Sequence, residues 1–324
     1  MKLQINLKNK LIPIIALLIG GVACAQDIYP SKPIKLVVPY PAGGGTDTIA
    51  RQLGNELSKN LNTPVIIENK PGASGSIGNN MVAKAPADGY TLLLGITALI
   101  QIPSLYAKVP YEVKDLAPVS LVARSMDVLM VPRSTGIPSF QEFAKRAKGE
   151  SSKWSIASYG NATSSHLHGA QLNMKLGTSL MHIPYAGSGP EMMAMLAGQV
   201  DAAFVDATAL SPHLGSDKLN FLAVTGSRRH PSLPQVPTMG ELGYTGFEAN
   251  GWFAVLAPAA TPKPIVQKLS QEIQKITQSA PVLNKLQEMG LIPAGTSPEE
   301  LGEVMVKDQK HWDSIAKASK ITMD

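Results

Sequence analysis

Short apolar runs alternate with amphipathic segments through most of this chain of 324 residues. The run IKLVV at 34–38 is followed by a segment in which Ile49, Leu53 and Leu57 recur every fourth residue, as on one face of a helix. Further strand-like runs lie at residues 65–69, 90–95, 127–131, 154–158, 180–185, 200–205, 219–224 and 252–258. Short apolar runs separated by amphipathic helices predict βαβ units with parallel strands, and therefore an α/β fold.

The last part of the chain has a different pattern, because only helical segments follow residue 258. Segments 264–279 and 280–290 are amphipathic, and a third helix is predicted to begin after Ser297. Ser297 suits the N-cap, Pro298 the first helical position and Glu300 the third, which is a typical helix start. Apolar residues then follow one stripe of the helix, as expected of a face that packs on a core.

The first 25 residues have the pattern of a secretory signal peptide. Three lysines precede the uncharged stretch LIPIIALLIGGVACA, which ends in Ala23-Cys24-Ala25. We predict cleavage after Ala25 and a soluble, exported protein located in the periplasm. A lipoprotein anchored through Cys24 is the alternative, which we favour less because Gly21 replaces the larger aliphatic residue of a lipobox. Cleavage would remove the single cysteine, so no disulfide is expected.

The net charge gives no indication of nucleic acid binding. The whole chain carries +5, and removal of the three leader lysines leaves +2. The basic cluster at Arg228, Arg229 and His230 is short and has no interleaved aromatic residues, so we expect no nucleic acid partner.

Two loops are candidates for ligand binding. PYPAGGGTD at 39–47 and SYGNATSSH at 158–166 each lead from a strand through small residues into a helix. The first amides of a helix have no internal partner, and glycine lets an anion approach them, so these loops indicate capture of a carboxylate or phosphate. A tight turn in which glycine only supplies positive φ is the alternative for either loop alone. Asp47 is compatible with an anion site if it caps free amides, or if the ligand also carries an ammonium group.

Motifs of several enzyme classes are missing from the sequence. The loop lacks the third glycine of a dinucleotide fingerprint, and the chain has no Walker loop and no G-x-S-x-G elbow. His166 and His168 are two residues apart, so on a helix they diverge and cannot share a metal ion. Asp201 and Asp206 close a strand, where they either cap the structure or line a cleft. We expect no cofactor, no metal and no enzymatic activity; an exported hydrolase that depends on His166 is a less favoured alternative.

Seven segments together resemble the Bug-type receptors, which are the periplasmic substrate-binding proteins of tripartite tricarboxylate transporters. They are YPSKPIKLVVPYPAGGGTD, VIIENKPGASGSIG, KAPADGYTLLLG, SYGNATSSHL, IPYAGSGPEMMAMLAGQVDAAF, LAVTGSRRHPSLPQVPTMGELG and WFAVLAPAATP. They occur in the family's order over nearly the whole chain after the leader, so the resemblance is specific as a set.

The resemblance implies a two-lobed periplasmic binding protein of the Venus flytrap type, with two chain crossovers and the C-terminal helices on the first lobe. The crossovers are expected near 121–128 and 247–255. Domain 1 would then comprise residues 26–123 and 250–324, and domain 2 would comprise residues 124–249.

The resemblance also implies a ligand held between the two loops. The ligand-binding residues it indicates are Tyr40, Ala42, Gly43, Gly44, Thr46, Asp47, Thr97, Ser158, Asn161, Ala162, Thr163, Ser164, His166, Tyr185, Gly187 and Asp206. Two positions depart from the family pattern: Ala162 replaces a frequent glycine, and the loop Ile96–Leu99 is unusually apolar. Both departures concern the far end of the ligand. The second favours a hydrophobic or aromatic acid, and a di- or tricarboxylate is the other candidate.

The expected partners follow from the same resemblance. They are a small organic acid and the integral-membrane permease subunits of a tripartite transporter, with the receptor itself a monomer. A receptor that signals to a sensor kinase would bind its ligand equally well and is the second alternative.

Overall fold

The computed structural model describes residue 1 and residues 29–150, 153–247, 251–321 and 323 of the chain. Apart from Met1, the predicted signal peptide lies outside the described residues, and so do its cleavage site and Cys24. Within the described ranges, no helix combines the length and the apolarity that crossing a membrane requires.

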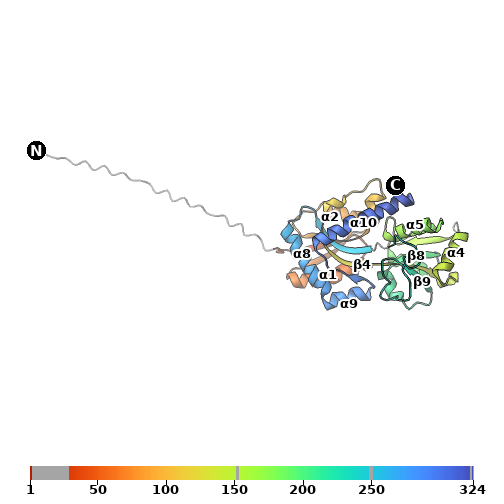
Figure 1. The fold of residues 1–324 in the computed structure, drawn as a ribbon. Helices are drawn as coiled ribbons and strands as arrows, with labels where there is room; N and C mark the ends of the chain where they lie inside the picture. Colours follow the sequence, from red (N-terminus) through yellow and green to blue (C-terminus); the bar gives the residue numbers. More distant parts are fainter. Residues whose placement is uncertain (2–28, 151–152, 248–250, 322, 324) are drawn as a thin grey trace.

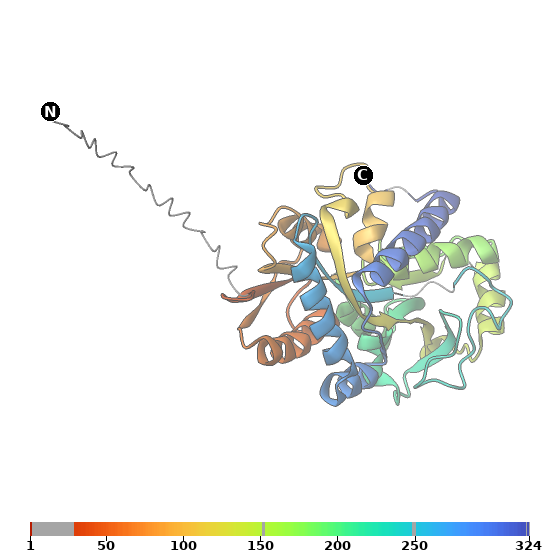
Figure 2. The ribbon, with the colours of Figure 1, turned by 60° about the vertical axis from the view of Figure 1, so that its left-hand side comes forward.

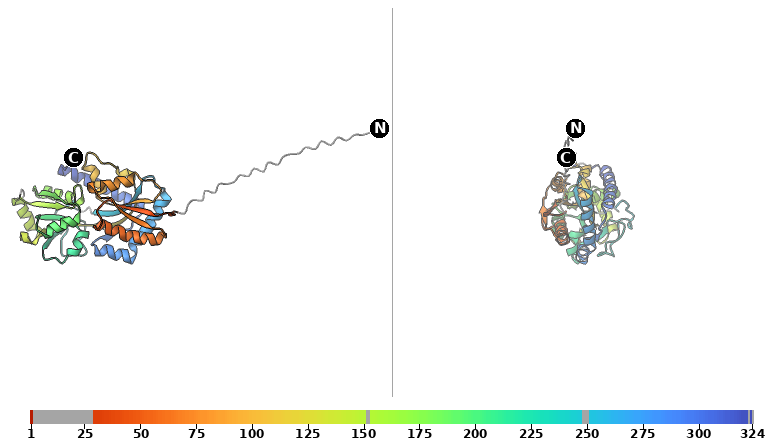
Figure 3. Two further views of the ribbon diagram at one scale, coloured as in Figure 1. Left: turned by 180° about the vertical axis from the view of Figure 1, so that it is seen from behind. Right: turned by 90° about the vertical axis from the view of Figure 1, so that its left-hand side faces the viewer.

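Two β-sheets, each covered by helices, divide the molecule into two lobes that lie side by side in Figure 1 and, seen from behind, in Figure 3. Lobe 1 contains a sheet with the strand order β11-β4-β10-β3-β1-β2. Its strands are β1 (Ile34–Val38), β2 (Val65–Asn69), β3 (Thr91–Ile96), β4 (Leu116–Ser125), β10 (Gly251–Pro258) and β11 (Ile292–Pro293). Strands β1, β2 and β3 are parallel, whereas β10, β4 and β11 continue the sheet in antiparallel pairs.

Lobe 2 contains a second sheet with the strand order β7-β6-β8-β5-β9. Its strands are β5 (Asp127–Pro132), β6 (Ser155–Ser158), β7 (Met181–Pro184), β8 (Ala202–Asp206) and β9 (Leu219–Val224). Its helices are α4 (Phe140–Glu150), α5 (Ser164–Leu176), α6 (Ser188–Leu196) and α7 (Ala207–Leu210). Strand β5 is antiparallel to both of its neighbours, while β6 is parallel to β7 and β8.

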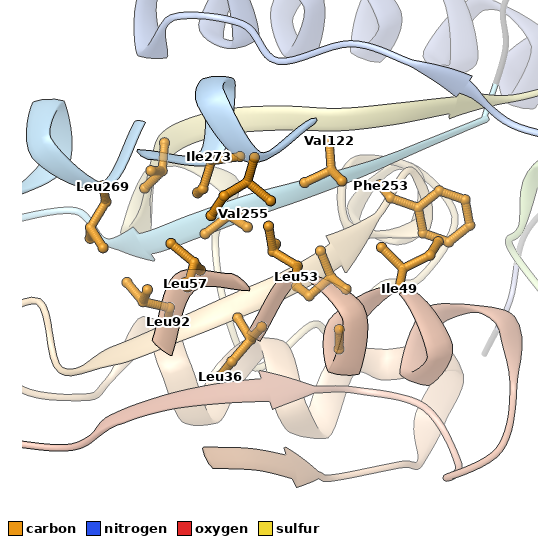
Figure 4. Close-up of a cluster of buried hydrophobic side chains, with 14 of the residues drawn as sticks. Leu36, Ile49, Leu53, Leu57, Leu92, Val122, Phe253, Val255, Leu269 and Ile273 are labelled. Atoms are coloured by element: carbon orange, nitrogen blue, oxygen red, sulfur yellow. The ribbon is translucent and has the colours of Figure 1, made fainter. Parts of the chain in front are cut away.

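The sheet of lobe 1 is buried on both faces, which explains its continuous apolar strands. The helices of this lobe are α1 (Gly45–Leu61), α2 (Ser76–Ala83), α3 (Ala98–Gln101), α8 (Lys263–Gln278), α9 (Ala280–Glu288) and α10 (Pro298–Ser319). Leu36 and Leu92 point to one face, where they meet Leu53 of α1 and Ile273 of α8 (Figure 4). Val37, the residue after Leu36 in β1, points to the other face of the sheet, which α2, α3 and α10 cover. Full burial of each such side chain contributes about 1.5–3 kcal/mol.

The chain passes between the lobes at the junction of β4 and β5, where Met126 alone separates the two strands. It is again part of the lobe 1 sheet at β10, although residues 248–250 of the return lie outside the described ranges. The exact domain boundaries at 123/124 and 249/250 remain predictions.

Helix α10 contacts both lobes. It begins with the predicted capping box, in which Ser297 Oγ accepts from the Glu300 amide at 3.1 Å and the Glu300 carboxylate accepts from the Ser297 amide at 2.8 Å. It then packs on β4 and extends to α5 of lobe 2, as its dark blue ribbon in Figure 2 shows. Near its end, the Trp312 ring lies 5.1 Å from the His168 ring of α5. The helix is therefore a third connection between the lobes.

The structure corrects the sequence analysis in one respect. The alternation of strands and helices predicted parallel sheets, but both sheets are mixed. In lobe 1 the antiparallel pairs involve β10, which was predicted as a strand, together with β4 and β11, which the local pattern did not indicate. Both pair with segments far away in the sequence, so no short-range periodicity reports them.

Candidate functional site

A cavity of about 480 Å³ lies between the lobes and is lined by residues of both. Lobe 1 contributes residues 40–46, Ile96, Thr97, Ala98, Ser125, Gly251, Trp252 and Phe253. Lobe 2 contributes Tyr159, Thr163, Ser164, residues 186–190, Asp206, Thr208 and Ala209. The volume is in the range of about 300–1,000 Å³ that small-molecule sites occupy.

Three helices of nine or more residues begin at this cavity without a side-chain cap. They are α1, α5 and α6, with Gly44, Thr163 and Gly187 at their N-caps. Two of these residues are glycines, which have no capping atom, and the Thr163 hydroxyl donates instead to the Gly160 carbonyl at 2.7 Å. The first amides of each helix are thus left for a ligand, and the helix dipoles add partial positive charge. The arrangement is suited to binding an anion from both lobes.

The three glycines of the 39–47 loop have different structural requirements. Gly43 has φ +83°, a conformation that favours glycine. A β-carbon on Gly45 would lie 2.3 Å from Thr208 Oγ1 of lobe 2, so this glycine permits close contact between the lobes. Gly44 has φ −79°, and a β-carbon there would meet only the Pro41 carbonyl, at 3.6 Å. The fold therefore tolerates a side chain at Gly44, and only a ligand would require glycine there.

The charge of the cavity wall is unusual for an anion site. Among the described residues that line it there is no lysine, arginine or histidine, and Asp206 is the only acid. Asp206 caps the short helix α7 by accepting from the Thr208 amide at 2.8 Å. It thus fulfils both roles that its sequence position suggested, since it caps a helix and lines the cavity. A ligand carboxylate would be held by neutral donors and would avoid the Asp206 side.

Two further acids lie behind the wall near Tyr159. Asp127 and Glu191 are buried, with at most 1% of each residue exposed. Burial raises the pKa of the Glu191 carboxyl well above its usual range, and Asp206 and Asp127 act in the same direction. This shift favours the neutral form of Glu191 and so disfavours a further negative charge near the cavity.

Asp47 is in the predicted site loop but is oriented away from the cavity. Its carboxylate accepts from the Gly43 amide at 2.9 Å, from Arg51 Nε at 2.8 Å and from Asn69 Nδ2 at 3.0 Å. The pKa of Asp47 is lowered because these hydrogen bonds together outweigh burial, which is the largest single effect and acts to raise it. The structure thus matches the capping role that made Asp47 compatible with an anion site.

Part of the cavity wall is apolar. Ile96, Trp252 and Phe253 form part of this wall, and Ile96 is the first residue of the loop whose apolar sequence departs from the family pattern. Thr97 lies on the same wall, and its hydroxyl accepts from the Trp252 amide at 2.7 Å. This bond joins the loop after β3 to the first residues of β10.

The structure brings most of the predicted residues together, but not all. Those that line the cavity are Tyr40, Ala42, Gly43, Gly44, Thr46, Thr97, Thr163, Ser164, Gly187 and Asp206. Those that do not line it are Asp47, Ser158, Asn161, Ala162, His166 and Tyr185. Direct ligand contact by these six has no support from the cavity geometry.

His166 and Ser158 take part in a separate cluster. The His166 ring stacks on His182 with 3.8 Å between centroids, and His166 Nδ1 accepts from the Ala162 amide at 3.2 Å. Ser158 Oγ lies 2.6 Å from His182 Nε2. Burial lowers the pKa of His166 to about 3, with His182 adding to the effect, and lowers that of His182 to about 4. With its ring in this stack, His166 forms no nucleophile–base pair with Ser164 of the kind the hydrolase alternative needs.

The sequence analysis did not include several wall residues. Ser188 and Gly189 follow a predicted site residue at the start of α6, and the segment AGSGP at 186–190 resembles the glycine-rich start of α1. Thr208, Trp252 and Phe253 also line the cavity, although no local motif indicates them. Tyr159 could have been found from its correspondence with Tyr40 in the two loops.

Comparison with known proteins agrees with this geometry. The model of the tripartite tricarboxylate transporter family receptor matches residues 49–321. The chain is 37% identical over 291 residues to the UPF0065 protein in the tcbD-tcbE intergenic region of Pseudomonas sp. strain P51, covering 89% of this chain and 87% of that protein. It is 34% identical over 316 residues to Protein BugT of Bordetella pertussis, covering 95% and 97% of the two chains.

Solved structures are similar over nearly the whole chain. The periplasmic binding protein BugD has a TM-score of 0.84 at 34% identity, covering 91% of this chain and all of its own. An R. palustris protein solved with adipate has a TM-score of 0.86 at 31% identity, covering 91% and 99%. MatC from Rhodopseudomonas palustris, with bound malate, has a TM-score of 0.81 at 29% identity, covering 89% and 99%.

Proposed function

Because the chain belongs to the family of tripartite tricarboxylate transporter receptors, we propose that it captures a small organic carboxylate between its lobes and delivers it to a membrane transporter. The family resemblance and the two-lobed α/β fold expected from the sequence are both confirmed. The chain is a periplasmic solute-binding protein of this family.

The observation that carries the proposal is the meeting of three uncapped helix N-termini at one cavity. Each hydrogen bond from such an amide to a carboxylate contributes about 1.5–3 kcal/mol, whereas micromolar affinity needs about 8 kcal/mol net. Losing the freedom of the ligand costs roughly 4–15 kcal/mol. The donors of one lobe are therefore insufficient, and both lobes have to contact the same carboxylate.

This requirement links binding to the position of the lobes. Only the arrangement with the lobes together offers the amides of α1 along with those of α5 and α6, so the ligand favours that arrangement over an open one. We propose that the permease subunits of the cognate transporter recognise the closed receptor.

The wall favours a carboxylate with an apolar or aromatic body. Ile96, Trp252 and Phe253 offer apolar contacts, while Asp206 disfavours a second carboxylate beside it. The adipate and malate bound by two similar proteins support an organic acid as the ligand class. Which acid binds depends on how its remote end fits this wall.

Isothermal titration of the purified receptor with adipate, malate, benzoate and phenylacetate tests the proposal. Inorganic phosphate and NAD serve as comparison anions. We expect at least one carboxylate to bind with micromolar affinity or better and the comparison anions not to bind. Binding of phosphate or NAD without any carboxylate would contradict the proposed function.

A further inference from the structure

A buried glutamine joins the two lobes next to the cavity. Gln101 is the last residue of α3, whose first residue Ala98 lines the cavity wall. Its side chain is completely buried, and its Nε2 donates to Ser164 Oγ of lobe 2 at 3.0 Å. The Gln101 Oε1 atom has no hydrogen-bond partner among the described residues.

The surroundings of Gln101 do not explain why a polar side chain occupies this position. Its chain neighbours Ile100 and Ile102 belong to an apolar cluster that also includes Ala162 and Leu167 of lobe 2. A buried carbonyl oxygen without a partner carries a desolvation cost that leucine or methionine would avoid. Among the described residues, the only hydrogen bond recorded for this side-chain amide is the one to Ser164.

That bond determines what the Ser164 hydroxyl can do. A serine hydroxyl has one hydrogen to donate and two lone pairs to accept with. Because Gln101 occupies a lone pair, the Ser164 hydrogen is directed to another acceptor. The Tyr159 hydroxyl, which also lines the cavity, interacts with it here, and an anion in the cavity would compete for the same hydrogen. Ser164 lines the cavity and is the first residue of α5, so its free amide and its hydroxyl can both donate to the same anion.

We propose that Gln101 is a positioning residue for anion capture, which holds the Ser164 hydroxyl as a donor toward the cavity. Gln101 belongs to lobe 1 and Ser164 to lobe 2, so the bond forms only when the lobes are together. Closure thereby completes the donor set around the ligand. This inference rests on the proposed function.

The variant Gln101→Glu tests whether the direction of this hydrogen bond, from residue 101 to Ser164, matters for binding. An ionised glutamate only accepts hydrogen bonds, so the Ser164 hydroxyl would donate to it and present lone pairs to the ligand. The probe is the tightest binder among adipate, malate, benzoate and phenylacetate, titrated between pH 5 and pH 8. At pH 8 we expect affinity about 10- to 100-fold below that of the unmodified receptor, the equivalent of one charge-assisted hydrogen bond. Affinity should recover as the pH falls, because a protonated glutamate can donate to Ser164 again.

Two matched variants separate this role from packing and from simple charge repulsion. Gln101→Met keeps the volume and removes the unpartnered oxygen, so we expect unchanged or higher thermal stability together with weaker binding. In a Ser164→Ala background, Gln101→Glu should lose most of its effect on affinity.

Wild-type affinity in Gln101→Met, or an equal effect of Gln101→Glu with and without Ser164, would overturn the role of Gln101. Both results would leave the proposed function intact. If the unmodified receptor binds none of the four carboxylates, that result would contradict the proposed function. The proposed role of Gln101 would then be contradicted as well.

Discussion

His168 Nδ1 lies 2.9 Å from a carboxylate oxygen of Asp127, at the point where the chain enters lobe 2. Both side chains are almost completely buried, and the Trp312 ring of α10 packs against the imidazole. The backbone of Asp127 is held as well, since Thr225 exchanges hydrogen bonds with it at 2.9 and 3.0 Å. The junction between the lobes is therefore anchored by a buried polar pair and covered by the C-terminal helix.

Removal of one partner of this pair should destabilise the fold strongly. We expect His168→Phe to lower the free energy of unfolding by about 3–5 kcal/mol, because Asp127 is left buried without its main partner. Urea denaturation followed by circular dichroism measures the change. The double variant Asp127→Leu with His168→Phe should be more stable than His168→Phe alone, and a single variant as stable as wild type would contradict the structural role.

A substitution at Gly44 should change ligand affinity without changing the stability of the fold. Serine at an N-cap accepts from the amides of the first turn, so Gly44→Ser would occupy the donors of α1 that the ligand needs. We expect stability within a few tenths of a kcal/mol of wild type and affinity reduced about tenfold or more. Titration calorimetry and thermal unfolding on the same samples measure both. Gly43→Ser is the control that should lose stability, because its φ of +83° disfavours a side chain; unchanged affinity in Gly44→Ser would refute capture at this helix.

Gly45 and Thr208 control how closely the lobes approach. In Gly45→Ala the new β-carbon would lie 2.3 Å from Thr208 Oγ1 and 2.8 Å from Thr208 Cβ. Such overpacking costs about 1–3 kcal/mol, which predicts affinity lowered by roughly 10- to 100-fold. Adding Thr208→Gly removes the obstructing atoms and should restore most of the affinity relative to Thr208→Gly alone. Failure of this rescue would show that the lobes do not meet at this contact when the ligand binds.

The stacked pair of His166 and His182 should make the protein less stable in acid. Their folded-state pKa values of about 3 and about 4 lie below the ordinary value of 6.5, so the unfolded chain binds more protons in this range. Their contribution is complete above pH 6.5 and decreases as the pH falls toward 4. The midpoint of urea unfolding should therefore decrease from pH 7 to pH 5.

The double variant His166→Asn with His182→Gln provides the control for this pH effect. Its urea midpoint should depend less on pH than that of wild type. Some dependence should remain, because burial also lowers the pKa of His230. An undiminished pH dependence in the double variant would exclude the histidine pair as its source.

The sequence predicted local features well because they depend on neighbouring residues. The helix start at Ser297 and the helices after both glycine- or serine-rich loops follow from capping and periodicity within a few positions. Most wall residues on these loops were indicated by the family resemblance, because its motifs coincide with the same two loops.

Features that depend on distant contacts were not predictable in this way. Strand β4 pairs with β10, more than 120 residues further along the chain, and Pro118 and Ser120 interrupt its apolar pattern. His166 lies in a predicted site loop, but its orientation is determined by stacking on His182 of β7. Gln101 follows three apolar residues on a short helix, and only the packing of the lobes shows that it reaches Ser164.

The lack of cationic side chains among the described residues of the cavity wall has a consequence for the conditions under which the receptor works. Mobile salt ions compete strongly for exposed lysine and arginine, but they screen backbone amides enclosed in a cavity much less. An exported receptor is exposed to whatever ionic strength surrounds the cell. Recognition through fixed amide dipoles would let it retain nearly the same affinity in dilute and in concentrated media.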